Sequence, residues 1–179
     1  MNLRAEKVAK SKRKQEIKEL YFSSFLKEDR MPFWMMLIMS YLWHTEFIAF
    51  YDDDTLCGFV YMATLRKVTF VMFFAVPENL RSKGYGSLIL DEVQALHSNH
   101  KIVISIEPCD DNAEDIQQRL RRKSFYLRNG YAETGYFMKL GGKEQEIIIK
   151  NGVFNKREFT TFFMLYSNCT IIPKIWSMV

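Results

Sequence analysis

Residues 71–93, VMFFAVPENLRSKGYGSLILDEV, determine how the rest of the chain is organised. The stretch begins with a run of apolar residues typical of a buried strand, and Pro77 ends that run. A turn at 81–86 follows and opens an amphipathic helix. The first N–H groups of a helix have no partner within it, and the helix dipole adds partial positive charge there. We therefore expect this turn to bind a phosphate or pyrophosphate.

The residue types in the turn suit an anionic ligand. Gly84 and Gly86 lack a Cβ, so the backbone can approach a ligand closely. Arg81 and Lys83 add full positive charges. Two common phosphate motifs are excluded, because the chain has no Gly-x-x-x-x-Gly-Lys-Ser/Thr sequence and Ile89 occupies the position of the third glycine in a dinucleotide fingerprint.

Length and composition predict one globular domain. The chain has 179 residues, of which 48% are hydrophobic, enough for a real core. We expect a single domain over residues 1–179, with its core at about 3–140 and a strand, helix and tail in 141–179 that complete the fold. The formal net charge of +4 fits an anionic ligand and is too small to indicate a nucleic-acid partner.

The cysteines and the N-terminus bear on location. The 3 cysteines are widely spaced and show no metal-ligand pattern, which predicts a reduced, cytoplasmic protein without a metal. The charged N-terminus lacks the apolar core of a signal peptide. The apolar segment 31–43 is shorter than the ~20 residues that span a bilayer. We therefore expect a buried or cleft-lining helix there and no membrane partner.

Hydrophobic periodicity predicts the elements around this stretch. Three strands at 46–51, 56–65 and 68–76 should form an antiparallel meander, with residues 52–54 as a solvated turn. A helix at 84–98 then crosses over to a strand at 101–107, which should run parallel to strand 68–76. The other predicted elements are strands at 3–8, 131–140 and 145–150 and helices at 12–26, 33–42, 113–128 and 156–166.

Two of these helices have predicted caps. Asn112 is expected to cap the helix at 113–128, and Gly130 should form its left-handed C-cap. Ile116, Leu120 and Leu127 are expected to face the core from that helix. Asn155 should cap the helix at 156–166.

Two motifs in this order resemble the GNAT superfamily of N-acetyltransferases. Residues 81–86 read Arg-x-x-Gly-x-Gly, which is similar to the family's Gln/Arg-x-x-Gly-x-Gly/Ala. Residues 125–131 read Phe-Tyr-x-x-x-Gly-Tyr, which is similar to its Phe/Leu-Tyr-x-x-x-Gly-Phe/Tyr. The resemblance covers about residues 3–140. It implies an α/β (α+β) fold, with a mixed, mainly antiparallel sheet whose central parallel pair splays to form a cofactor slot and with helices on both faces.

The resemblance also implies acetyl-CoA as the acetyl donor, without a metal. Its pantetheine arm would pair with free backbone groups near Phe74 and Val76, as an added strand would. Its pyrophosphate would bind the backbone of the turn, which consists of Arg81, Ser82, Lys83, Gly84, Tyr85 and Gly86.

Direct attack of an amine on the thioester needs a base for the amine and an acid for the leaving thiolate. Tyr126 matches the family's acid position, although a tyrosine there could also simply pack the helix end. Glu107 is the first candidate for the base, and Glu46 is the second. The alternative for Glu107 is a strand-end carboxylate paired with an arginine.

Arg119 departs from the family pattern, in which many members carry Asn at this position. Arg119, Arg122 and Tyr126 share one face of the predicted helix by their spacing. One of the two arginines is expected to contact the cofactor's phosphates or to pair with Glu107. The alternative is a solvated basic helix.

The resemblance predicts an N-acetyltransferase that acts on a primary amine of a small molecule or peptide. The alternative is a non-catalytic acyl-CoA-binding or regulatory module on the same fold. An apolar tail at 171–176 should either pack on the sheet or form a homodimer interface.

Overall fold

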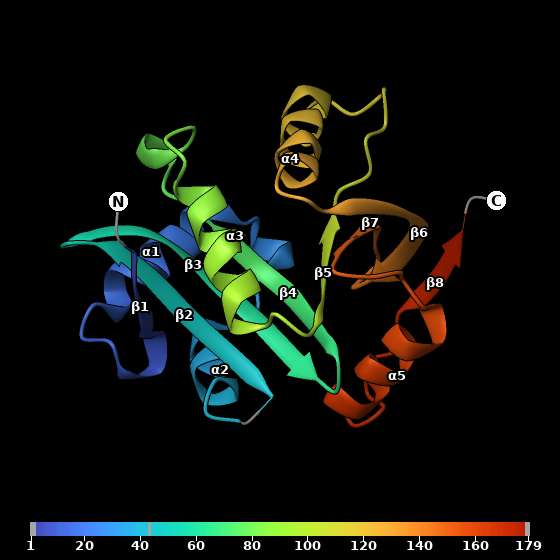
Figure 1. Ribbon diagram of the computed structural model, residues 1–179, viewed down its shortest axis with the longest axis horizontal. Coiled ribbons are helices and arrows are strands. Elements are labelled where there is room, and N and C mark those ends of the chain that lie inside the picture. Colours follow the sequence, from blue (N-terminus) through green and yellow to red (C-terminus); the bar gives the residue numbers. More distant parts are fainter. Residues whose placement is uncertain (1–2, 43, 178–179) are drawn as a thin grey trace. The chain divides into compact units, whose positions relative to one another are not determined.

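The computed structural model describes residues 3–42 and 44–177, and these residues form eight β-strands and five α-helices (Figure 1). They make two compact units, and the described residues of the first lie within 3–64 and 71–98 and those of the second within 65–70 and 99–177. No helix within the described residues is both long and apolar enough to cross a lipid bilayer.

The strands of the first unit follow the order β1-β2-β3-β4. Both β1 and β3 pair antiparallel with β2, in registers that place Ala5 opposite Phe50 and Phe47 opposite Tyr61. The strand β4 lies next to β3 and follows it after only two residues, so the predicted meander of β2, β3 and β4 is present. The bounds of these strands are β1 Leu3–Lys7, β2 Thr45–Asp52, β3 Thr55–Leu65 and β4 Val68–Ala75.

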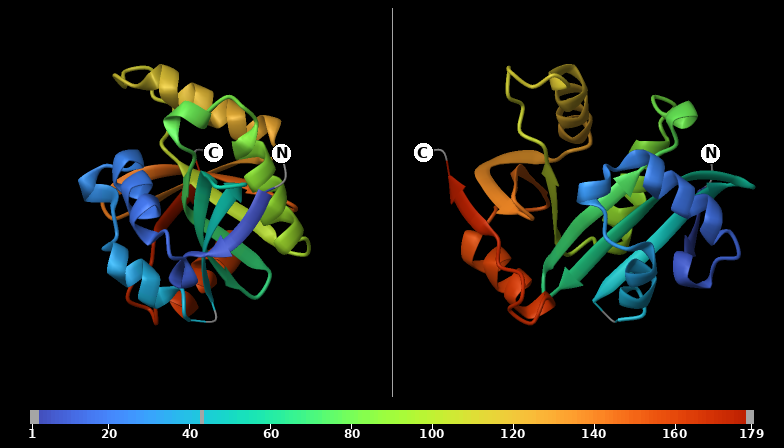
Figure 2. Two further views of the ribbon diagram at one scale, coloured as in Figure 1. Left: turned by 90° about the vertical axis from the view of Figure 1, so that its left-hand side faces the viewer. Right: turned by 180° about the vertical axis from the view of Figure 1, so that it is seen from behind.

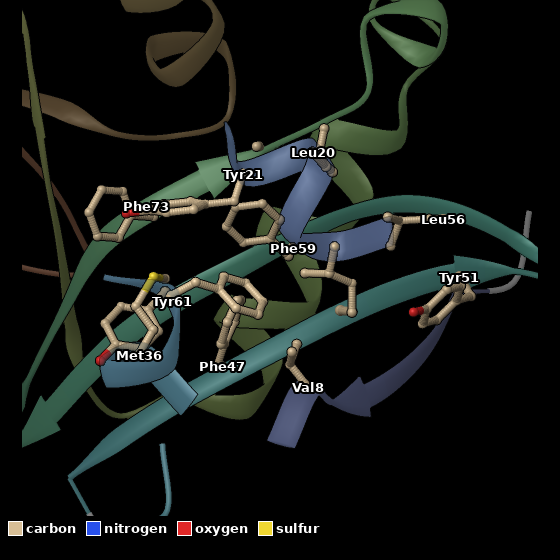
Figure 3. Packing of buried hydrophobic residues seen from close by; sticks show 14 residues of the cluster. Val8, Leu20, Tyr21, Met36, Phe47, Tyr51, Leu56, Phe59, Tyr61 and Phe73 are labelled. Carbon is tan, nitrogen blue, oxygen red and sulfur yellow. The ribbon is translucent and has the colours of Figure 1, made fainter. Parts of the chain in front are cut away.

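Helices cover both faces of this part of the sheet (Figures 1 and 2). The helices α1 (Lys14–Ser24) and α2 (Phe33–Met39) lie on one face, and α3 (Tyr85–Leu96) lies on the other. The core under α1 is aromatic (Figure 3). Tyr21 is fully buried there, and its ring meets that of Phe73 edge-on at 5.2 Å. Short 3₁₀ helices occur at η1 Val8–Lys10, η2 Lys27–Asp29 and η3 Glu78–Leu80.

A β-bulge brings β3 very close to the end of β4. Phe50 pairs with Gly58 and Tyr51 pairs with Leu56, so Cys57 is the extra residue. A Cβ added to Gly58, whose φ is +156°, would lie 2.5 Å from the Ala75 carbonyl oxygen. Only glycine therefore fits beside the strand end that leads into the turn at 81–86.

The strands of the second unit follow the order β4-β5-β7-β6-β8, with residues 68–70 as its share of β4. The Lys101 N–H donates to the Lys67 carbonyl at 2.9 Å, where β4 and β5 begin. The helix α3 crosses over between these two strands, which form the parallel pair of the mainly antiparallel sheet, as predicted. The bounds are β5 Lys101–Ile106, β6 Ala132–Leu140, β7 Lys143–Lys150 and β8 Lys174–Ser177.

The C-terminal part of the second unit has its own aromatic core. The helix α5 (Lys156–Tyr166) begins at Asn155, whose side chain accepts the Glu158 N–H at 3.0 Å as predicted. Phe70 packs against Phe159 with ring centroids 5.4 Å apart. The end of the apolar tail joins the sheet, because β8 pairs antiparallel with β6, whereas Ile171 and Ile172 are 49% and 54% exposed.

Three predictions for the helix α4 (Ile116–Arg128) were wrong. The helix starts three residues later than expected, and Asn112 does not cap it. Instead, the Asp110 carboxylate accepts hydrogen bonds from the Asn112 backbone and side chain, at 2.9 and 3.1 Å, which holds residues 110–112 in a turn. Leu120 and Leu127, expected in the core, are 44% and 40% exposed.

Candidate functional site

The turn at the start of α3 exposes its backbone N–H groups. Ser82 (φ +61°) and Gly84 (φ +90°) are left-handed, and Gly84 is the N-cap residue of α3. The first bonds of the helix run from the N–H groups of Ser87 and Leu88 to the Gly84 carbonyl, at 3.1 and 3.2 Å. Within the described residues, no group accepts a normal hydrogen bond from the N–H groups of residues 82–86. These amides are therefore available to an anion at the positive end of α3.

Charge and space at the turn also fit an anion. Arg81 and Lys83 are exposed, and the Arg81 Nε donates to the Val76 carbonyl at 3.4 Å, which keeps the guanidinium beside the turn. A Cβ added to Gly84 would meet no atom within 4 Å, so the space over the turn is open. Phe74 and Val76 are half-buried at the end of β4.

Asp52 fixes the turn from the neighbouring hairpin. The Tyr85 hydroxyl donates to Asp52 Oδ2 at 2.9 Å, and this hydrogen bond raises the pKa of Tyr85. It joins the first residue of α3 to the end of β2. The sequence assigned Asp52 only to a solvated turn, because nothing in the pattern connects residues 33 positions apart.

Tyr126 lies in the last turns of α4 in the second unit, with its ring buried. Gly130 is left-handed (φ +81°), and the Tyr131 N–H donates to the Tyr126 carbonyl at 3.2 Å, so the predicted C-cap is present. Burial raises the pKa of Tyr126 to about 12, although Arg122 opposes this shift. No described residue forms a hydrogen bond with its hydroxyl. The phenol therefore carries a proton at neutral pH and has it free to donate.

The charged residues near Tyr126 form two separate pairs. Arg122 forms an ion pair with Glu107, which follows β5. Arg119 donates to Asp115 Oδ1 at 2.7 Å and to the Pro108 carbonyl at 3.0 Å. Of the two arginines that were candidates for pairing with Glu107, it is therefore Arg122 that does so.

The second candidate base lies elsewhere. In the first unit, a Glu46 carboxylate oxygen lies 2.8 Å from His97 Nε2, near the C-terminal end of α3. Glu46 is thus at the opposite end of this helix from the turn at 81–86. Within residues 3–42 and 44–177, no three His, Cys, Asp or Glu side chains come together as metal ligands would.

Lys123 anchors α4, which the sequence did not predict. Its ammonium lies 2.9 and 3.0 Å from the two carboxylate oxygens of Glu146, which is 6% exposed, and it also pairs with Glu133. Burial alone would lower the pKa of Lys123, but its hydrogen bonds to these two carboxylates raise it. The sequence pattern gave this lysine no signal, because it looks like any residue of a solvated basic helix face.

A family model described as an acetyltransferase (GNAT) domain matches residues 43–133, a range that holds both the turn at 81–86 and Tyr126. A protein of the GNAT family from Bacteroides thetaiotaomicron superposes with a TM-score of 0.72 at 18% identity, over 93% of this chain and 98% of that one. A search of curated protein sequences found no match.

Two further solved structures contain coenzyme A. An aminoglycoside 6'-N-acetyltransferase complexed with coenzyme A gives a TM-score of 0.66 at 13% identity, over 84% of this chain and 96% of that one. The PaiA N-acetyltransferase from Thermoplasma acidophilum, also in complex with coenzyme A, gives 0.58 at 16% identity, over 85% and 100%. At these identities the structures show a common fold.

Proposed function

The chain belongs to the GNAT family of acetyltransferases, and on this premise we propose that it transfers the acetyl group of acetyl-CoA to a primary amine of a small molecule or peptide. The observation that carries the proposal is the turn at 82–86, whose N–H groups are unbonded within the described residues and face open space at Gly84. The coenzyme A in two structures of the same fold supports the choice of donor.

We assign the pyrophosphate to the turn in the first unit. Its amides would donate hydrogen bonds to the phosphate oxygens, and Arg81 and Lys83 would add charge. The bond from Tyr85 to Asp52 holds the first turn of α3 in place, so the amides keep their direction when the ligand is absent. Phe74 lies on β4 and Val76 follows the end of that strand, and these are the residues we assign to the pantetheine arm.

We assign the acid role to Tyr126. In direct attack, the amine nitrogen forms a bond to the acetyl carbonyl carbon, the bond to sulfur breaks, and the thiolate takes a proton. The Tyr126 phenol is protonated at neutral pH and has no competing hydrogen bond to a described residue. We propose Glu107 as the group that takes the proton from the amine, directly or through water. The ion pair with Arg122 orients its carboxylate.

The test measures release of the CoA thiol while acetyl-CoA is offered a panel of aminoglycosides, polyamines, amino acids and peptide N-termini. We expect at least one amine class to accelerate release and to gain an acetyl group by mass spectrometry. Tyr126→Phe should lower kcat by roughly 100-fold or more, the usual value of acid catalysis. Tyr136→Phe, which alters a half-buried tyrosine of β6, is the matched control and should keep the wild-type kcat.

Two results would contradict these assignments. Equal kcat values for Tyr126→Phe and the wild type would remove the acid role while leaving the enzyme class intact. Binding of acetyl-CoA without release by any amine would count against amine transfer and favour an acyl-CoA-binding module.

A further inference from the structure

The net positive charge of this protein comes from its N-terminal segment. Residues 1–44 contain nine Lys or Arg and five Asp or Glu, a formal net charge of +4. This equals the net charge of the whole chain, so residues 45–179 are neutral overall. An anionic partner that is recognised by net charge would therefore be attracted to the N-terminal segment.

The same segment exposes a large apolar surface on and just after α2. No charged residue occurs in 31–43. Phe33 and Met36 are the buried residues of α2, whereas Trp34, Ile38 and Tyr41 are 64%, 57% and 71% exposed. Trp34 and Ile38 are four residues apart in α2 and therefore lie on one side of the helix, and Tyr41 comes two residues after its end. We call this surface, with Leu42 (48% exposed), the α2 face.

Lysines lie next to the α2 face. The helix α2 packs against η1, and the Tyr41 hydroxyl donates to the Ala9 carbonyl of η1 at 3.3 Å. Both views of Figure 2 show these elements side by side. Lys7, Lys10 and Lys12 lie in or beside η1 and are exposed, and none of them pairs with a described residue. We call these three residues the lysine edge.

We propose that the α2 face and the lysine edge together dock on an anionic lipid membrane surface. Stable interfacial binding needs both apolar insertion and electrostatic attraction, and this region supplies both. Trp and Tyr favour the headgroup level of a bilayer. With 7 residues, α2 is too short to span the bilayer, so it lies in the interface.

Two other partners fit these observations less well. A nucleic acid offers phosphates to the lysines and bases that stack on Trp34 and Tyr41, but it leaves the aliphatic Ile38 and Leu42 exposed, whereas a membrane interface buries all four side chains. A second copy of the chain would bring two positively charged segments together, at an electrostatic cost. The proposal departs from the expectation that the chain has no membrane partner, and it does not depend on the proposed acetyl transfer.

The test is co-sedimentation of the full chain with phosphatidylcholine vesicles that do or do not contain phosphatidylserine. We expect binding only to the phosphatidylserine vesicles, with loss at high salt. Lys10→Ala/Lys12→Ala should weaken binding by about 25-fold, since each basic residue near an anionic surface contributes about fivefold. Trp34→Ser/Ile38→Ser should weaken it by roughly tenfold or more through loss of buried apolar area.

Matched controls come from exposed residues elsewhere in the chain. Lys139→Ala/Lys156→Ala and Val153→Ser/Leu165→Ser remove the same kinds of group and should bind as the wild type does. Thermal melts verify that each variant is folded. Failure of the folded wild type to bind phosphatidylserine vesicles would overturn the proposal. So would light scattering that shows a dimer which Trp34→Ser/Ile38→Ser dissociates, because the α2 face would then belong to a second copy.

Discussion

Replacing Gly58 by alanine should destabilise the protein more than the same replacement at a glycine that has open space around it. The added Cβ would lie 2.5 Å from the Ala75 carbonyl oxygen and 2.8 Å from Ile89 Cδ1. The Ile89 methyl group can rotate away, but the carbonyl belongs to the backbone of β4 and can move only if the strand moves. A φ of +156° is also one that L-residues rarely adopt.

The expected loss combines these two effects. Overpacking against a rigid neighbour costs about 1–3 kcal/mol, and the unfavourable backbone adds about 1 kcal/mol, which gives about 2–4 kcal/mol. For a chain of this length, 1 kcal/mol corresponds to about 2–4 °C, so the melting temperature should fall by roughly 4–16 °C. Gly142→Ala is the control, because Gly142 has φ +85° and a Cβ there would meet no atom within 4 Å. It should lose only the backbone part.

Differential scanning calorimetry of the wild type and both variants measures the difference. If Gly58→Ala melts within 2 °C of Gly142→Ala, then β3 can move away from β4 at little cost. The close packing of β3 on the strand end that leads into the turn at 81–86 would then not be a fixed feature of the fold.

Three further predictions concern the turn, Tyr126 and the anchor of α4. Gly84→Ala and Gly142→Ala each place a Cβ on a left-handed residue in open space, so calorimetry should give the two variants similar melting temperatures. The affinity for acetyl-CoA should fall at least roughly tenfold in Gly84→Ala and stay at the wild-type value in Gly142→Ala. Equal affinities of the two variants would contradict the site. Burial raises the pKa of Tyr126 to about 12, and an unfolded tyrosine ionises near 10, so the wild type should lose stability as pH rises between these values. In urea denaturation, the free energy of unfolding of Tyr126→Phe should fall by about 1.4 kcal/mol less per pH unit than that of the wild type between these pH values. Parallel plots of this free energy against pH for the two proteins would refute the prediction. Lys123→Met should lower the free energy of unfolding by about 3–5 kcal/mol, because it leaves the Glu146 carboxylate without its cation. The double variant Lys123→Met/Glu146→Gln should regain most of that stability in the same urea denaturation. A double variant no more stable than Lys123→Met would show that the ion pair contributes little.

Local signals in the sequence were enough for most of the fold. The apolar run at 68–76, Pro77 and the glycines of the turn each constrain their own backbone, so β4 and α3 appear within two residues of the predicted bounds. Gly130 is another such case, because its left-handed conformation depends on the residue type itself. Predictions failed where neighbouring side chains compete to form the same local hydrogen bonds. Asp110 binds Asn112 and delays the start of α4, and the sequence does not show which of these two side chains will act.

The candidate site was only partly predictable, for the same physical reason. The turn at 81–86 is contiguous in the chain, so its exposed amides follow from the pattern alone. The contacts of Tyr85 with Asp52 and of Lys123 with Glu146 join residues that are 33 and 23 positions apart, and only the packing of each helix beside the strands brings them together. The pair of Arg122 with Glu107 was one of two alternatives that helix spacing left open, and the position of the end of β5 decides between them.

The most direct test of the central claim, that the turn at 81–86 binds the pyrophosphate of acetyl-CoA, is calorimetric titration of the purified chain with acetyl-CoA. The titration is repeated with Gly84→Glu, which places a carboxylate in the open space over the turn. We predict micromolar binding to the wild type and its loss in a variant that is still folded. Absence of binding to the folded wild type, or equal binding to Gly84→Glu, would mean that the turn is only the start of a helix.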